Sequence, residues 1–326
     1  MMQAKPQFPL NFAHAYEMLV GSAELKVEPE DFVVVEEFDE TSFSGVGEHV
    51  CLQIRKRGQN TRWVAAALAD LAGTAERNVG FCGMKDRRAV TTQWFSVPQA
   101  DDWRMPPLAI PGCEVLKVVR HQRKLRRGSH QGNHFLIRLR NVSEPIDIKS
   151  IDERLMLIAE KGVPNYFGEQ RFGIEGHNLV EADRLLRRGR QRKMGGRQGI
   201  YISAARSYLF NQVLSERVKQ NSWSQVLEGE VAPQGPLWGR GRSCSMGELS
   251  QLEDRVLVNY QSWCNALEHL GLEQQRRNLL LQPQQLEWHW QGGDLCLSFT
   301  LPVGTYATTV LRELLEVDTP APRPVL

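Results

Sequence analysis

The order in which strand-like and helix-like patterns follow one another is the feature that most limits the fold of this chain. Residues 25–38 run through β-branched residues, and residues 47–58 alternate apolar and polar side chains, as strands do. Helical spacing dominates from 163 to 281, and strand patterns return at 284–302. This order favours one α+β domain that is interrupted by a helical insertion, and 326 residues are enough to build it.

Within this outline the sequence predicts several individual elements. The segment RWVAAALADLAG follows Thr61, a suitable N-cap, and ends at Gly73, so it is expected to be a helix. Helical spacing continues through 249–281, and TTVLRELLE at 308–316 predicts a final helix. Residues 229–247 are rich in Gly, Pro and Ser and are expected to form a loop.

Several functional classes are excluded by missing patterns. No window holds eighteen consecutive apolar residues, so no transmembrane helix is expected. The start of the chain lacks the basic and apolar regions of a secretory signal, and the expected compartment is the cytoplasm. The six cysteines contain no C-x-x-C pair, and there is neither a G-x-G-x-x-G nor a Walker motif. We therefore expect no metal and no nucleotide or other organic cofactor.

The charge of the chain is unevenly distributed. Residues 115–215 hold 20 Lys and Arg against 9 Asp and Glu, although the net charge of the whole chain is only +2. Within this region lie two basic stretches, 120–127 and 184–197. The first contains the cations that we expect to contact a phosphate backbone, which are Arg123, Lys124, Arg126 and Arg127. Short charge runs are often merely solvated, but an asymmetry over about a hundred residues favours a polyanion-binding face.

The segment GMKDRRAVTTQ at 83–93 places Asp86 among cations on a loop between two predicted strands. Nearby positive charge favours the ionised carboxylate that a nucleophile or a general base requires. A turn aspartate that bonds to its own backbone is nevertheless the commoner structure at such a position. Lys85 is by default a surface lysine. The residues of this segment alone leave the role of Asp86 open.

Aromatic and polar residues elsewhere could hold an RNA base that has been exposed for chemistry. Phe32 and Tyr306 could stack on such a base, and Asn133 could hydrogen-bond to its edge. Phe135 closely follows Asn133, and Arg312 lies in the final predicted helix. Each of these residues alone is more commonly structural, because aromatic residues at strand ends usually belong to the core and asparagine after glycine is common in turns. The residues by themselves therefore indicate an RNA-binding α+β protein that needs no cofactor.

Seven motifs together resemble the TruD-type tRNA pseudouridine synthases. They occur in that family's order and extend over nearly the whole chain, from about residue 25 to 314. The motifs are KVEPEDFVV at 26–34, NTR at 60–62, GMKDRRAVT at 83–91, KLRRG with GNHF at 124–135, VPNYFGEQRFG at 163–173, AARSYLFN at 204–211 and LPVGTYAT at 301–308. The combination of GMKDRRAVT with NYFGEQRFG is highly specific for this family.

The resemblance implies both an architecture and a reaction. It implies a pseudouridine-synthase catalytic domain with a mixed, mainly antiparallel sheet, split into 1–162 and 282–326, and a helix-rich TRUD insertion domain at 163–281. The implied reaction converts uridine to pseudouridine in tRNA, usually at position 13 in the D-arm. The expected partner is therefore tRNA, with no membrane and no obligate protein partner.

The resemblance also assigns roles to individual residues. Asp86 matches the catalytic aspartate, and the residues that match substrate-binding positions are Phe32, Asn133 and Tyr306. The family often has Phe where this chain has Tyr306, and the ring is retained. Further support of the site is expected from Lys85, Phe135 and Arg312.

The chemical role of Asp86 remains open from the sequence, because three roles are possible. Asp86 could attack C1′ of the ribose, attack C6 of the uracil, or remove a proton from the sugar. Isomerisation imports no bond energy, which agrees with the expected absence of a cofactor.

One alternative function is that of a non-catalytic tRNA-binding or tRNA-folding protein, which would not need Asp86. A metal-dependent nuclease is a second alternative, but it would need clustered carboxylates, and the GMKD segment has only one.

Overall fold

The computed structural model describes residues 7–17, 21–99, 110–143, 148–187, 196–241 and 245–320. The chain forms two compact units. The first, which we call the helical unit, comprises Met1–Leu19, Glu153–Gln282 and Thr305–Leu314. The second, the sheet unit, comprises Val20–Asp152, Pro283–Gly304 and Leu315–Leu326. These units partition the chain differently from the predicted split into catalytic and insertion domains, which stays a prediction.

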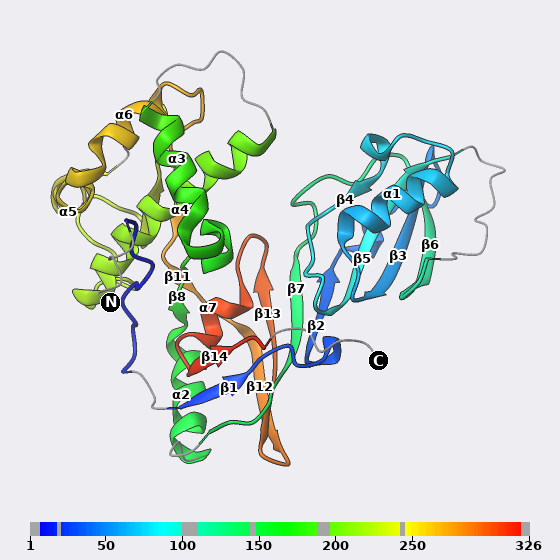
Figure 1. Cartoon of the computed structure of the whole chain (residues 1–326), viewed down its shortest axis with the longest axis horizontal. Coiled ribbons are helices and arrows are strands. Elements are labelled where there is room, and N and C mark those ends of the chain that lie inside the picture. Colours follow the sequence, from blue (N-terminus) through cyan, green and yellow to red (C-terminus); the bar gives the residue numbers. More distant parts are fainter. Residues whose placement is uncertain are drawn as a thin grey trace, which may run out of the picture. The chain divides into compact units, whose positions relative to one another are not determined.

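The sheet unit is built on one eight-stranded sheet (Figure 1). Its strands follow the order β12-β13-β7-β2-β5-β3-β6, with β4 added beside β5. Their bounds are β2 Phe32–Glu37, β3 His49–Arg57, β4 Gly80–Phe81, β5 Val90–Pro98, β6 Cys113–His121, β7 Gly132–Leu139, β12 Gln284–Gln291 and β13 Asp294–Pro302. Away from this sheet, β1 (Ser22–Glu24) pairs in parallel with β14 (Glu316–Asp318).

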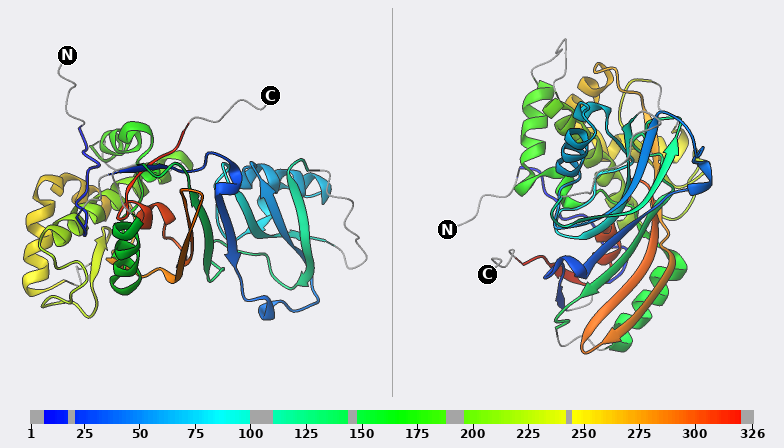
Figure 2. Two further views of the ribbon diagram at one scale, coloured as in Figure 1. Left: turned by 90° about the horizontal axis from the view of Figure 1, so that it is seen from below. Right: turned by 90° about the vertical axis from the view of Figure 1, so that its right-hand side faces the viewer.

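The sheet is mixed and mainly antiparallel, as predicted. Its parallel pair joins β2 to β5 at the centre, and the other neighbouring strands run antiparallel. Strand β2 alternates in burial, with Phe32, Val34 and Glu36 on its buried side. Strands distant in sequence meet here, because β13 pairs with β7 along the whole length of β7. The hairpin of β12 and β13 is drawn in orange in Figure 2.

Helix α1 (Thr61–Leu71) packs on this sheet through the residues of its apolar face. Val64 and Leu68 belong to one buried cluster with residues of β3 and β5, including Phe95. The predicted helix is confirmed, but its N-cap is Asn60, whose side chain accepts a hydrogen bond from the backbone of residue 62. Thr61 is instead buried and faces the loop that carries Asp86.

The helical unit contains most of the remaining helices (Figure 2). Its longer ones are α3 His177–Arg187, α4 Gly196–Lys219, α5 Gly247–Leu257 and α6 Gln261–Glu268, followed near the C-terminus by α7 Ala307–Leu311. Helix α2 (Ile148–Lys161) spans the border between the two units. Side chains of α3, α4 and α6 share one aromatic-rich core, which includes Tyr208 and Trp263. No helix in the described part of the chain is long and apolar enough to cross a membrane.

Two helix predictions were wrong in part. Residues 249–281 were expected to be helical throughout, but the helices end at Glu268, and Gly271 follows with a φ of +75°. The next segments form β10 (Gln275–Asn278), which pairs with β9 (Gln234–Leu237), and β11 (Leu280–Leu281), which pairs with β8 (Val163–Pro164). The final helix stops at Leu311, and the chain reaches β14 five residues later. Strand β9 also lies inside the predicted loop at 229–247.

Candidate active site

Asp86 lies on the loop between β4 and β5, and its carboxylate faces a buried lysine. Lys26 Nζ is 2.7 Å from Asp86 Oδ2, and the side chains are 7% and 42% exposed, respectively. The carboxylate therefore meets a fixed positive charge on one side and remains open to solvent on the other. Its hydrogen bond goes to Lys26 and not to its own turn, so the commoner structural alternative for a turn aspartate is not formed.

Lys26 is held in an unusual backbone conformation. Its φ is +59°, a value that costs a residue with a side chain about 1–3 kcal/mol unless its surroundings enforce it. Arg88 donates to the Lys26 carbonyl oxygen at 2.9 Å, and Lys26 Nζ lies 4.1 Å from the centroid of the Phe32 ring. Three contacts thus fix this lysine beside Asp86. Sequence reasoning missed it, because the two residues are 60 positions apart.

Lys85, the residue before Asp86, fixes the same loop to the protein interior. Its Nζ forms an ion pair with Glu36 Oε2 at 2.9 Å, and the two side chains are 5% and 0% exposed. Glu36 Oε1 also accepts the backbone N–H of Trp94 at 3.0 Å, and the Lys85 backbone N–H donates to Thr61 Oγ1 at 3.0 Å. Lys85 is therefore not the surface lysine that its position in the sequence suggests by default.

A second buried lysine holds the backbone of Asp86 itself. Lys56 is fully buried, and its Nζ donates to the carbonyl oxygens of Gln59 at 2.8 Å and of Asp86 at 3.1 Å. Burial lowers the pKa of the Lys56 ammonium to about 8. The loop that carries Asp86 is thus attached to the end of β3 by a group that titrates in an accessible pH range.

This lowered pKa predicts a pH-dependent stability. Because the pKa of an unfolded lysine is near 10.4, the unfolded chain binds more protons than the folded one above about pH 8. The contribution of Lys56 to the free energy of unfolding therefore rises with pH across that window. The melting temperature of the wild type minus that of Lys56→Met should therefore increase from about pH 7 to about pH 9.5. An exposed control, Lys117→Met, should show a constant difference, and so would Lys56→Met if this account were wrong.

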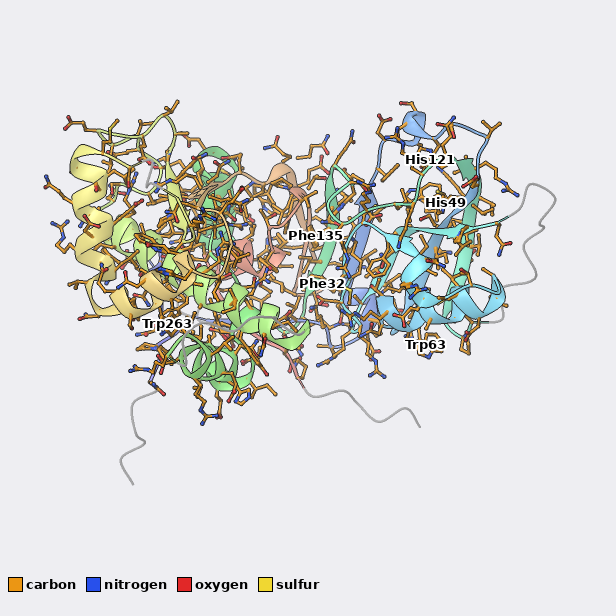
Figure 3. All side chains as sticks on the ribbon, turned by 90° about the horizontal axis from the view of Figure 1, so that it is seen from above. Phe32, His49, Trp63, His121, Phe135 and Trp263 are labelled. Carbon is orange, nitrogen blue, oxygen red and sulfur yellow. The ribbon has the colours of Figure 1, made fainter. Side chains whose placement is uncertain are left out.

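Phe32, Asn133 and Phe135 share one face of the sheet. In the register of β2 against β7, Val34 lies opposite Phe135 and Glu36 lies opposite Asn133. Phe32 and Phe135, both labelled in Figure 3, are buried. Their rings meet edge to face, with centroids 6.0 Å apart. Both rings therefore contribute to the core of the sheet unit, and stacking of Phe32 on a base remains a prediction.

Asn133 carries an unsatisfied acceptor. Its Oδ1 is buried and has no hydrogen-bond partner. Such an atom costs about 1–3 kcal/mol, which a ligand that donates a hydrogen bond can recover. A residue that hydrogen-bonds to the edge of a substrate base needs such a free acceptor before the substrate binds.

Tyr306 and Arg312 belong to the helical unit. The Tyr306 hydroxyl accepts a hydrogen bond from Arg171 Nη2 at 2.7 Å. Arg312 is the C-cap of α7, donates to the Phe12 carbonyl oxygen at 2.8 Å and pairs with Glu313 Oε1 at 2.9 Å. Arg312 therefore holds the N-terminal segment and is not a solvated helix residue. That Tyr306 joins Asp86 at one site remains a prediction.

The first basic stretch presents its charges to solvent. All four of its predicted phosphate-binding residues are exposed, namely Arg123, Lys124, Arg126 and Arg127. Between them Leu125 is buried, and its backbone N–H donates to Ser96 Oγ at 2.9 Å. The loop is thus anchored. Lys124 also donates to the Arg77 carbonyl oxygen, and the Arg127 guanidinium lies 4.4 Å from the centroid of the Phe81 ring, but all four cations keep an exposed surface. In the second stretch, residues 188–195 lie outside the described residues, and Arg184 and Arg187 pair with acids of α3.

One cluster near the loop has the residue types of a metal site. Potential ligand atoms of Glu36, Cys82 and His130 lie within 4.8 Å of one another, and all three residues are buried. The Lys85 ammonium already neutralises Glu36. Burial also raises the pKa of the Cys82 thiol to about 12 and lowers that of His130, so these groups are a neutral thiol and a neutral imidazole. A divalent ion would have to displace Lys85, so the cluster suits the ion pair better than a metal.

Comparisons with known proteins agree on one family. The family model of tRNA pseudouridine synthase D (TruD) matches residues 16–194 and 224–314. A tRNA pseudouridine synthase D from Cellvibrio japonicus is 46% identical over 97% of this chain and 96% of its own length. Another, from Marinobacter nauticus, is 42% identical over 91% of this chain and 92% of its own.

A solved structure supports the fold. It is the crystal structure of a candidate tRNA pseudouridine synthase D from Methanosarcina mazei, with a TM-score of 0.69 and 19% sequence identity. The match covers 95% of this chain and 98% of that one. At this identity the likeness concerns the fold alone, and the predicted α+β architecture is confirmed. Together, the family model and the two bacterial relatives show that the chain belongs to the tRNA pseudouridine synthase D (TruD) family.

Proposed function

We propose that this chain converts a uridine of tRNA to pseudouridine with Asp86 as the catalytic carboxylate, and that its target is position 13 in the D-arm. Membership of the family makes the chain a tRNA pseudouridine synthase. The observation that carries the assignment to Asp86 is its pairing with Lys26, which orients the carboxylate and leaves it partly exposed. The target position follows from the resemblance in sequence.

The reaction requires no redox partner. The bond between C1′ of the ribose and N1 of the uracil breaks, a bond between C1′ and C5 forms, and the proton of C5 is lost while N1 gains one. Asp86 could attack C1′ or C6, or remove a proton from the sugar, and each role needs the free carboxylate oxygens to reach the substrate. The exposed side of Asp86 supports such an approach.

The neighbouring residues have distinct roles in this proposal. The target nucleotide must leave the RNA stack before Asp86 can reach it. Asn133 Oδ1, which lacks a partner, would accept the N3–H of the uracil and keep the orientation of the base. The family resemblance implies that Phe32 and Tyr306 also contact the base. The exposed cations of 120–127 would bind the tRNA backbone, so that affinity falls with added salt.

Removal of the lysine beside Asp86 tests its positioning role. Lys26→Met deletes the ion pair and frees the carboxylate to rotate, so we expect the rate of the chemical step to fall about 10- to 100-fold. Lys26→Arg, which keeps a cation near the carboxylate, should lose less. The measurement is a single-turnover rate with saturating enzyme. A Lys26→Met protein with the wild-type rate would show that this ion pair has no part in catalysis.

The loss of the C5 proton offers a direct test of the function. A tRNA transcript labelled with tritium at C5 of its uridines should release one tritium per molecule modified when it is incubated with the purified protein. Release that stops at one equivalent per tRNA would support modification of a single site. Tight binding without any release, for several different tRNAs, would favour the non-catalytic tRNA-binding alternative.

A further inference from the structure

Two arginines of the helical unit approach the same aromatic ring. The guanidinium carbon of Arg277 lies 4.2 Å from the centroid of the Phe167 ring, and that of Arg171 lies 5.4 Å from it. Arg171 belongs to the 3-10 helix Glu169–Phe172, and Arg277 belongs to β10. Phe167 is buried, whereas both arginines remain partly exposed. The two cations therefore lie against the same buried ring, and both remain accessible to solvent.

The contacts of Arg171 are made with neutral groups. Its Nη2 donates to the Tyr306 hydroxyl at 2.7 Å, its Nη1 donates to Ser203 Oγ at 3.2 Å, and its buried Nε has no partner. A guanidinium has five N–H donors, so this one is incompletely satisfied. Within the described residues Arg171 forms no ion pair with a carboxylate, and its charge is left without a counter-ion.

Other arginines of the same unit show how a buried guanidinium is usually accommodated here. Three of them ion-pair with a carboxylate within 3 Å, and the pairs are Arg217 with Glu230, Arg276 with Glu253 and Arg312 with Glu313. At Phe167, by contrast, Arg171 has no such carboxylate within the described part of the chain, and Arg277 donates to Asn165 Oδ1, a neutral group, at 2.6 Å. Burial lowers the pKa of Arg277 to about 10. The neighbouring Tyr306 opposes this shift, and the charge of Arg171 adds to it, so the two cations repel each other in a partly desolvated place. An anion between or beside them would relieve this cost.

We propose that Arg171 and Arg277 form the binding site for one phosphate of the tRNA backbone. This inference rests on the proposed function. A phosphodiester has the charge and the paired oxygens that guanidinium forks bind. The site adjoins Tyr306, which resembles a substrate-binding residue of the family and which Arg171 itself holds. A phosphate bound there would fix the register of the RNA strand on the helical unit.

The test compares arginine variants by their affinity for tRNA at several salt concentrations. Binding of an unmodified tRNA transcript is measured in the Asp86→Asn background, so that no turnover occurs. We expect Arg171→Met to weaken binding about 10- to 100-fold, the range for a lost hydrogen bond to a charged group. Its plot of log affinity against log salt should be shallower by about 0.7 to 0.9, which corresponds to one phosphate. The matched control is Arg255→Met, an exposed arginine of α5 in the same unit, and it should change neither quantity.

A conservative variant separates charge from geometry. Arg171→Lys keeps the cation but loses the fork, so it should bind more weakly than the wild type with an unchanged salt slope. Arg171→Met with wild-type affinity, or with weaker binding and an unchanged slope, would overturn the proposal. So would an Arg171-dependent rise in melting temperature with inorganic phosphate while tRNA affinity stays the same, because the site would then serve a free anion.

The outcome is independent of whether the enzyme proposal holds. If the wild type forms no pseudouridine but Arg171→Met still loses affinity and slope, the catalytic proposal fails and the phosphate site stands. If the wild type is active and Arg171→Met binds with the wild-type slope, the phosphate site alone fails.

Discussion

Asp86→Asn is expected to lower the single-turnover rate of pseudouridine formation by about 10⁴-fold, the upper end of the range for loss of one acid–base group. Asparagine has nearly the shape of aspartate, and its amide oxygen can still accept the hydrogen bond from Lys26. What it lacks is the negative charge that any of the three chemical roles requires. The affinity for tRNA should remain within about threefold of the wild type, because the exposed basic residues that would bind the backbone are unchanged.

The matched control is Asp70→Asn, which removes an exposed aspartate of α1 from the same unit. It should have the wild-type rate and affinity. An Asp86→Asn protein that retains more than about a tenth of the rate would exclude a catalytic carboxylate at this position. Parallel loss of rate and of tRNA affinity would indicate that Asp86 maintains the structure of its loop instead.

Lys85→Met is expected to destabilise the protein by about 3–5 kcal/mol, which is typical when one partner of a buried ion pair is removed. The methionine fills most of the space but leaves the fully buried Glu36 carboxylate without its counter-ion. The hydrogen bond that Glu36 still accepts from the Trp94 backbone N–H offsets only part of the lost free energy of unfolding. We expect the melting temperature measured by calorimetry to fall by roughly 6–15 °C.

Two further variants distinguish a buried charge from a general packing defect. Lys85→Met combined with Glu36→Leu removes both charges and should recover much of the lost stability. Lys117→Met breaks an ion pair with Glu40 whose partners are 53% and 44% exposed, and it should cost less than about 1 kcal/mol. If Lys85→Met and Lys117→Met shift the melting temperature equally, the Lys85–Glu36 pair does not support the loop of Asp86.

The strands could be predicted because their pattern is local. Alternation at 32–37 and 49–57 records which side chains face the core, and both segments form strands of the sheet. The parallel pairing of β2 with β5 is not encoded in either strand alone, since it depends on where the connecting segment crosses. The strand at 275–278 was missed because its charged residues lack apolar alternation, and its pairing with β9 decides its conformation.

The candidate site, too, could be predicted from the sequence only in part. The motif located Lys85, Asp86 and their loop, but the partners that hold this loop meet it only in the folded chain. Lys26 lies beside the carboxylate, Lys56 reaches the Asp86 carbonyl, and Lys85 pairs with Glu36. In sequence each is an ordinary lysine, because burial and partners across 30 to 60 positions leave no local pattern.

The central claim is tested most directly by mapping pseudouridine, with base-specific chemical labelling, in an unmodified tRNA transcript incubated with the purified wild-type protein. No metal or cofactor is added, and Asp86→Asn is treated in parallel. We predict modification of a single uridine, at position 13 of the D-arm, with the wild type and none with the variant. Modification of the same uridine by both proteins, or of none by the wild type across a panel of tRNAs that it binds tightly, would contradict the account.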